Sequence, residues 1–256
     1  MTVDFGRTAQ DYATHRAGFP EVLFERLAAL GIGRDGQRIL DLGTGTGSLA
    51  RGFAKRGARV TALDPSKDLM AQARVLDEAA GVSIDYRVGK AEQTGLPDAA
   101  FDVVGAGQCW HWFDRAVAAR EVRRLLVPEG RLLITHFDWL PLPGNVVAAS
   151  EALIERYNPD WAYGGGKGIY PAWFDDAALA GFEDIEGFTF DLAVPYSHEA
   201  WRGRIRASAG VGGSLPDDKV EVFDREHQAL LAEAFPEDLL SVPHRVFALT
   251  ARAPGA

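Results

Sequence analysis

Short apolar runs alternate with longer segments of helical periodicity through the first half of the chain. Runs of strand length occur at residues 38–41, 59–64, 84–88, 101–106 and 131–136. The segments between them have helical patterns, most clearly up to about residue 56, from 65 to about 80, and from 114 to 126. Repeated strand–helix units of this kind predict a parallel sheet with helices on both faces.

The second half of the chain has a less regular pattern. Residues 138–176 are rich in Pro, Gly, Trp and Tyr, and loops of this length are usually lids, binding elements or insertions. Strands are expected at 182–194 and 245–251, and helices at 199–206 and 217–235. We expect one continuous domain over residues 1–256, with a small cap formed by residues 138–176 and 196–240.

A glycine-rich turn follows the first predicted strand. The strand ends at Asp41, and Gly43-Thr44-Gly45-Thr46-Gly47 then leads into a helix-compatible segment. Glycines without Cβ atoms let a ligand lie against the backbone, and the following helix start offers free N–H groups. The spacing Gly45-x-Gly47-x-x-Ala50 loosely satisfies a dinucleotide fingerprint. The full pattern D-x-G-x-G-x-G instead resembles motif I of class I S-adenosylmethionine-dependent methyltransferases, where an acid suits a cofactor with an ammonium and a sulfonium.

Asp64 ends the second predicted strand, about twenty residues after the glycines. An acid at this place can accept hydrogen bonds from both hydroxyls of an adenosine ribose. The alternative is a carboxylate that only starts the helix beside Pro65. Because NAD and S-adenosylmethionine both contain this ribose, Asp64 does not separate the two cofactors.

Residues 89–104, including Ala91-Glu92 and the later Leu96-Pro97, resemble the segment after the third strand in type 11 methyltransferases related to ubiquinone and menaquinone biosynthesis. The resemblance implies that Ala91 and Glu92 lie against the adenine. Lys90 departs from the family, which often has an acid there, and lysine only donates hydrogen bonds. Adenine recognition must then depend on the backbone or on Glu92.

The segment after the fourth predicted strand faces the ligand side of an open α/β sheet. Its His-Trp-Phe-Asp sequence resembles the motif IV region of a methyltransferase subset. The resemblance implies that Gln108, three residues earlier in the same segment, contacts the cofactor. His111 is a candidate general base or substrate contact, and Trp110 and Trp112 are candidate substrate contacts. The alternative is structural: Asp114 would cap the next helix, and Trp112 and Phe113 would lie in the core.

The N-terminal leader, residues 1–30, matches the same subset through a Tyr-x-x-x-Arg pattern. Tyr12 and Arg16 are four residues apart and would share a helix face. The resemblance implies a lid over the cofactor, in which Arg16 pairs with the methionine carboxylate. An exposed amphipathic helix is the alternative.

Two further substrate candidates lie in the second half. One is Tyr170, and the other is Arg206, the last of three alternating arginines with Arg202 and Arg204. Such a run could bind an acidic substrate, or it could be a solvated helix face with one buried member.

Composition and charge bear on the partners and the cellular compartment of the protein. The 256 residues carry a net charge of −9, and no long basic run favours a nucleic-acid partner. The single Cys109 fits a reducing compartment, and no signal peptide, apolar run of membrane-spanning length or metal-ligand spacing is found. We expect a cytoplasmic protein with no metal and no membrane partner, and a possible homodimer.

These features together predict an α/β, Rossmann-like doubly wound sheet, mostly parallel with an antiparallel C-terminal strand, plus a small cap. The predicted function is methyl transfer from S-adenosylmethionine to a small-molecule acceptor by in-line displacement. Two alternatives stay open: a fold relative that binds S-adenosylmethionine without transferring methyl, and an NAD-dependent oxidoreductase.

Overall fold

The computed structural model describes residues 15–255, and its contacts divide the chain into two compact units. The sheet unit contains residues 18–137, 169–189 and 246–255 of the described part. The helical unit contains residues 15–17, 138–168 and 190–245. The ranges of the helical unit overlap the segments that the sequence assigns to a cap, 138–176 and 196–240.

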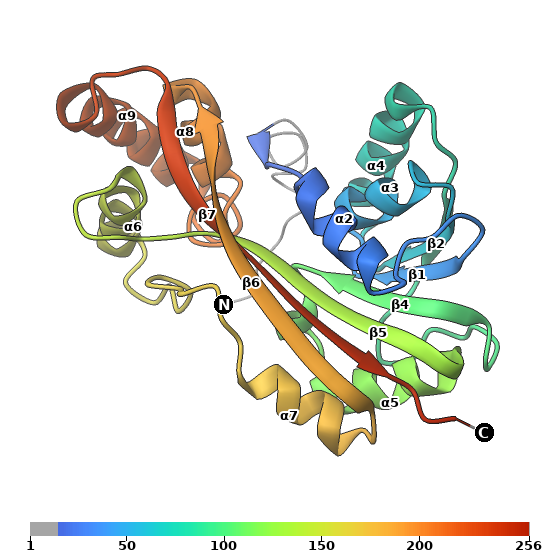
Figure 1. Ribbon diagram of the computed structural model, residues 1–256. Coiled ribbons are helices and arrows are strands. Elements are labelled where there is room, and N and C mark those ends of the chain that lie inside the picture. Colours follow the sequence, from blue (N-terminus) through green and yellow to red (C-terminus); the bar gives the residue numbers. More distant parts are fainter. Residues whose placement is uncertain (1–14, 256) are drawn as a thin grey trace. The chain divides into compact units, whose positions relative to one another are not determined.

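Within residues 15–255, seven strands form one sheet in the order β3-β2-β1-β4-β5-β7-β6. Their bounds are β1 (Arg38–Leu42), β2 (Arg59–Asp64), β3 (Asp85–Val88), β4 (Phe101–Gly107), β5 (Leu126–Trp139), β6 (Glu183–Tyr196) and β7 (Leu240–Arg252). Strands β1 to β5 pair in parallel, and β7 runs against its neighbours β5 and β6 (Figure 1). The predicted Rossmann-like sheet with an antiparallel C-terminal strand is confirmed.

Five helices of the sheet unit surround these strands. They are α2 (Glu21–Ala29), α3 (Ser48–Ala54), α4 (Lys67–Ala80), α5 (Arg115–Leu125) and α7 (Ala172–Leu179). Helices α3 and α4 lie on one side of the parallel strands, and α5 and α7 lie on the other (Figure 1). The side chain of Asp114 accepts a hydrogen bond from the Val117 N–H at 3.2 Å, so the predicted cap of α5 is present.

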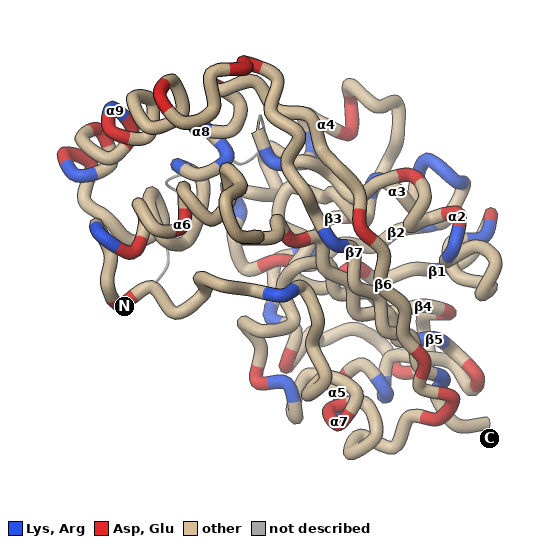
Figure 2. The backbone as a smooth tube through the Cα atoms, turned by 60° about the vertical axis from the view of Figure 1, so that its left-hand side comes forward, with Lys and Arg blue, Asp and Glu red and all other residues tan. Residues whose placement is uncertain are grey.

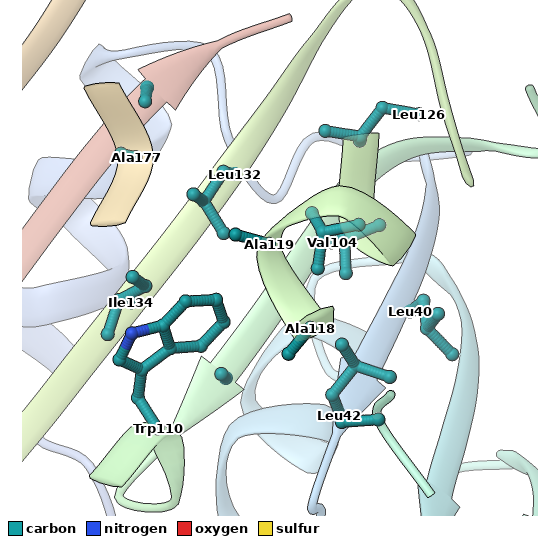
Figure 3. Close-up of a cluster of buried hydrophobic side chains, with 14 of the residues drawn as sticks. Leu40, Leu42, Val104, Trp110, Ala118, Ala119, Leu126, Leu132, Ile134 and Ala177 are labelled. Carbon is teal, nitrogen blue, oxygen red and sulfur yellow. The ribbon is translucent and has the colours of Figure 1, made fainter. Parts of the chain in front are cut away.

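The core of the sheet unit lies between the strands and α5. Leu40, Val104 and Leu132 come from neighbouring strands, and Ala118 and Ala119 approach them from α5 (Figure 3). All five side chains are fully buried. Strands covered on both faces need continuous apolar runs, which explains why the sequence located them well.

The helical unit contains α6 (Val146–Tyr157), α8 (His198–Arg206) and α9 (Asp217–Ala234). The expectation of an irregular segment over 138–176 is wrong, because α6 and the start of α7 lie inside it. The side chain of Asn145 caps α6 by accepting from the Ala148 N–H at 2.9 Å, and Val147 and Ile154 are buried in the core of this unit. The flanking Pro, Gly and aromatic residues hid this short helical pattern.

Charged side chains of both signs lie along α9, and no strand or helix of the sheet unit carries a long run of one sign (Figure 2). Within residues 15–255, no helix has the length and apolar character that crossing a bilayer requires.

Candidate functional site

The predicted glycine turn connects β1 to α3 in the sheet unit. Gly43, Gly45 and Gly47 have φ angles of +61°, +55° and +79°, a region that side chains with a Cβ rarely adopt. The Gly47 N–H donates to the Thr44 carbonyl at 2.9 Å, and the Thr44 N–H donates to the carbonyl of Leu63 in β2 at 3.1 Å. A Cβ built on Gly45 would have no atom within 4 Å, so the backbone is open to a ligand there.

Asp41 lies in β1 behind this turn and is buried, with a relative exposure of 1%. Its Oδ2 accepts a hydrogen bond from the Thr44 hydroxyl at 2.7 Å, whereas Oδ1 has no hydrogen-bond partner in the part of the chain that the structure describes. Burial raises the pKa of Asp41 to about 7, although the Thr44 hydroxyl and the Ala50 backbone lower it. A positively charged ligand group near this carboxyl would favour its ionised form.

Asp64 lies at the carboxyl end of β2 and connects two loops. Its Oδ2 accepts from the Gly45 N–H at 2.8 Å, and its Oδ1 accepts from the Ser66 N–H at 2.7 Å. Burial raises the pKa of Asp64, and these two hydrogen bonds lower it. A carboxylate has about four acceptor positions, so two remain for ligand hydroxyls. Pro65 is exposed between Asp64 and Ser66. The predicted helix-start role and the predicted ribose role are therefore compatible.

The loop after β3 carries the predicted adenine contacts. Ala91 is buried in the core of the sheet unit. The Oε1 atom of Glu92 accepts a hydrogen bond from the Asp114 N–H at 3.0 Å, so this side chain supports the start of α5. The Gln93 N–H donates to the Lys90 carbonyl at 3.3 Å, which closes a narrow turn. With Glu92 used in this way, an adenine ring would depend mainly on the backbone of the loop.

Gln108 follows β4 in a left-handed conformation, with φ of +64°. Its backbone N–H donates to the Thr135 carbonyl at 2.8 Å, and its side-chain Nε2 donates to the Phe137 carbonyl at 2.6 Å. A glutamine in this strained region of φ is held by the neighbouring strand β5. Such strain is common beside binding sites.

The two tryptophans after Gln108 have opposite environments. Trp110 is fully buried in the core, and its Nε1 donates to Asp176 at 3.0 Å (Figure 3). Trp112 is 41% exposed, and Phe113 is only partly buried. The structural alternative, which placed Trp112 in the core, is therefore wrong, because Trp110 and not Trp112 packs in the core. The three-residue 3₁₀ helix Trp110–Trp112 turns the first indole inward and the last outward.

His111 is exposed, and its ring lies beside two aromatic neighbours. Its ring centroid is 4.6 Å from that of Trp112 and 5.2 Å from that of His136. His136 is buried, and its ring lies 4.7 Å from Tyr170 and 4.8 Å from Trp173. The sequence analysis missed His136. Its place near the carboxyl end of the fifth predicted strand was the available signal.

The three alternating arginines of α8 have different partners. Arg202 and Arg206 both pair with Asp224 and Glu199, and Arg206 does so at 2.9 and 3.1 Å. Arg204 is 8% exposed, with its guanidinium 4.4 Å from the ring centroid of Trp139. Arg206 therefore belongs to an ion-paired helix face, and Arg204 is the buried member of the run.

The parallel strand order brings most of the predicted cofactor residues together. The turn after β1, Asp64 at the end of β2, the loop after β3 and Gln108 after β4 all lie at the carboxyl edge of neighbouring strands. Arg16 and Arg206 belong to the helical unit, and Tyr12 lies outside the described residues. Among residues 15–255, no group of three or more His, Cys, Asp or Glu side chains is arranged to hold a metal ion.

Comparisons with known proteins agree with this geometry. Residues 40–134 match the family described as a methyltransferase domain, type 11. The ubiquinone biosynthesis O-methyltransferase of Xanthomonas axonopodis pv. citri is 31% identical over 180 residues, which cover 68% of this chain and 72% of that protein.

Two solved structures share the fold. A protein described as a type II methyltransferase from Anaeromyxobacter dehalogenans has a TM-score of 0.66 at 23% identity, covering 94% of this chain and 99% of that one. The phosphoethanolamine N-methyltransferase 2 of Haemonchus contortus, solved with phosphomonomethylethanolamine and S-adenosylhomocysteine, has a TM-score of 0.57 at 20% identity. The match covers 97% of this chain and 57% of that one.

The family match and the curated relative agree with the glycine turn and its acids, and they leave the NAD-dependent alternative without support. The chain belongs to the type 11 methyltransferases of the class I S-adenosylmethionine-dependent family, and its activity is methyl transfer from S-adenosylmethionine.

Proposed function

We propose that S-adenosylmethionine is held by the carboxyl edge of β1 to β4 and that the acceptor is a small molecule. The supporting observation is the turn at Gly45, which is open to a ligand and is joined to Asp64 by a 2.8 Å hydrogen bond. Gly43, Thr44 and Gly47 shape the turn. The remaining proposed cofactor contacts are Pro65, Ala91, Glu92 and Gln108.

The two acids have separate proposed roles. Asp64 would accept the ribose hydroxyls at its unused acceptor positions, and Asp41 would stabilise the positive charge of the cofactor from behind the turn. The bound cofactor supplies a methyl group activated by a sulfonium. The protein aligns the acceptor with that methyl, and alignment contributes up to about 7–11 kcal/mol in well-oriented reactions.

We propose that the acceptor lies beside His111 and Trp112, because both side chains are exposed after β4. An exposed indole can stabilise a nearby cation by about 0.5–1 kcal/mol. If the acceptor atom must lose a proton, a histidine base would add about 10²–10⁴-fold. His136 and Tyr170 would then support the His111 ring from the sheet unit.

The similar proteins do not share one acceptor atom. One is an O-methyltransferase and another an N-methyltransferase, so the proposal stays with a small molecule. A cytoplasmic location and a homodimer remain predictions, and fractionation and size-exclusion chromatography test them. The net charge of −9 supports the expectation that nucleic acid is not the substrate.

The N-terminal leader and the segments 138–176 and 196–240 remain the proposed lid and substrate elements. The lid is confined to the residues before α2, because Leu23, Phe24 and Leu27 of α2 are buried core side chains. Hydrogen exchange in the leader around Tyr12 and Arg16, and in residues 158–171 between α6 and α7, should slow when S-adenosylhomocysteine is added, whereas the buried helix α6 should be protected in both states. Equal protection with and without ligand would contradict the lid.

Two experiments test the proposed function. Calorimetric titration should show binding of S-adenosylhomocysteine and none of NADH. Incubation with methyl-labelled S-adenosylmethionine and a metabolite extract should then yield a labelled small molecule. Cofactor binding without any labelled product would favour the alternative of a relative that binds the cofactor but does not transfer methyl.

A matched pair of variants tests the histidine. His111→Gln keeps a polar side chain of similar size, whereas Trp112→Phe removes only part of the neighbouring ring. A base at His111 predicts a fall in kcat for the first variant of about 10²-fold or more and a change in its pH profile. Equal and small effects of both variants would assign His111 to packing.

A further inference from the structure

A buried ion pair between α3 and α4 lies beside Gly47 of the glycine turn. The Nε of Arg51, in α3, donates to Oδ1 of Asp77, in α4, at 2.8 Å. The side chains are 15% and 6% exposed, so the pair is largely removed from water. None of the roles proposed above for cofactor or acceptor uses these two residues.

The same guanidinium also holds the turn itself. The Nη2 of Arg51 donates to the Thr46 carbonyl at 2.7 Å and to the Ala73 carbonyl at 3.3 Å. Thr46 lies between Gly45 and Gly47, so the arginine connects the turn to the body of α4. A planar guanidinium presents several donors in a fixed arrangement, which a lysine cannot reproduce.

Tyr86, in β3, is the third member of this network. Its hydroxyl donates to Oδ2 of Asp77 at 2.7 Å, so both carboxylate oxygens of Asp77 are used. A Cβ built on Gly47 would lie 2.8 Å from the Tyr86 hydroxyl oxygen and 3.1 Å from Nη2 of Arg51. Gly47 is thus packed against this network, while Gly45 faces open space.

We infer that Arg51, Asp77 and Tyr86 are positioning residues for cofactor binding, which act by fixing the glycine turn in its ligand-accepting conformation. The turn has three glycines at positive φ, and such a segment loses much conformational entropy when it is ordered. The network fixes the Thr46 carbonyl before any ligand arrives, so the cofactor does not have to order the turn when it binds. The inference depends on cofactor binding at this turn, as proposed above.

Three variants test this role by calorimetric titration with S-adenosylhomocysteine, well below each unfolding midpoint. Arg51→Lys keeps the positive charge but loses the planar arrangement of donors. Asp77→Asn keeps the size of the side chain but loses its negative charge. Both should raise the dissociation constant by about tenfold or more, as expected for one charged hydrogen bond. Tyr86→Phe should raise it by about fivefold, because it removes one hydroxyl.

The control is Arg38→Lys, which alters the Arg38–Asp102 pair at the amino ends of β1 and β4. It should leave the dissociation constant unchanged. If the role were only structural, the Arg51 and Asp77 variants would lower the unfolding midpoint without changing the affinity of the folded protein. Unchanged affinity in both folded variants would overturn the inference.

Two outcomes need a second measurement. If the Arg51 and Asp77 variants do not fold, Tyr86→Phe decides: a raised dissociation constant supports the positioning role, and an unchanged one overturns it. If the wild-type protein does not bind S-adenosylhomocysteine, the proposed cofactor site fails. Backbone hydrogen exchange of residues 43–48 in the ligand-free variants then still tests the network, because unchanged protection relative to the wild type would overturn it.

Discussion

His227, in α9, is an uncharged histidine in the core of the helical unit, and it makes the stability of this protein depend on pH. Its side chain is fully buried, with Nε2 2.9 Å from the Ser150 hydroxyl oxygen. That hydroxyl donates to the Val146 carbonyl at 2.7 Å and accepts from Nε1 of Trp201 at 2.9 Å. Because Ser150 has one proton to donate, Nε2 of His227 acts as the donor of their hydrogen bond.

The other ring nitrogen, Nδ1, therefore carries no proton, and it has no hydrogen-bond partner among the described residues. Protonating it would place a charge in the core, and burial lowers the pKa of His227 to about 4. In the unfolded chain this histidine binds the proton near pH 6.5. The stability that the neutral ring contributes to the folded protein is therefore complete above that pH, and it falls as the pH drops towards 4. The loss is about 2 kcal/mol at about pH 5 and about 3 kcal/mol at about pH 4.

The assay is urea denaturation of the wild type and His227→Gln at a series of pH values between 8 and 5. His244 provides the matched comparison, because it is also buried and its pKa is also lowered to about 4. Over this range the unfolding free energy of the wild type should fall by about 2 kcal/mol relative to each single Gln variant and by about 4 kcal/mol relative to the double variant. These differences isolate the two histidines, because Asp41 titrates in the same way in all four proteins. Parallel pH curves for the wild type and His227→Gln would refute this reasoning.

Three further predictions concern the sheet unit. Asp64→Ala should weaken S-adenosylhomocysteine binding by about 10–150-fold in calorimetry, and an unchanged affinity would limit Asp64 to bracing the Gly45 loop. Asp41→Asn should stabilise the ligand-free protein by up to about 4 kcal/mol at about pH 8 in urea denaturation. The pKa of Asp41 is raised to about 7, so ionising this buried carboxyl destabilises the folded protein as the pH rises from about 4 to 7. A variant less stable than the wild type at about pH 8 would contradict this. Gly52→Ala should destabilise by about 1–3 kcal/mol, since its Cβ would overlap the Phe24 ring, and Phe24→Leu in the same chain should recover part of the loss in thermal unfolding.

The sequence located the sheet well because its strands are buried on both faces. Residues 59–64 match β2, and 101–106 match β4 to within one residue. The glycine turn and Asp64 could also be predicted, because a left-handed turn restricts the residue types that can form it. The same local reasoning missed α6, where a good N-cap at Asn145 was surrounded by residues typical of loops.

Contacts between distant residues were beyond this reasoning. The sequence does not indicate that Arg51 meets Asp77 across 26 residues, or that Glu92 supports Asp114 across 22 residues. The two tryptophans on either side of His111 were also ambiguous, because a 3₁₀ helix turns them differently from an α-helix or a strand. The role of each side chain there depends on which elements pack nearby, and composition does not encode that directly.

The position of β7 has a consequence for biosynthesis. This strand is synthesised after both β5 and β6, yet it lies inside the sheet, between them. Until residues 240–252 leave the ribosome, β5 and β6 have no shared partner and both expose unpaired backbone edges. The nascent chain therefore completes this sheet only after residues 240–252 have been synthesised, and the exposed edges of β5 and β6 are the surface that a chaperone would have to protect until then.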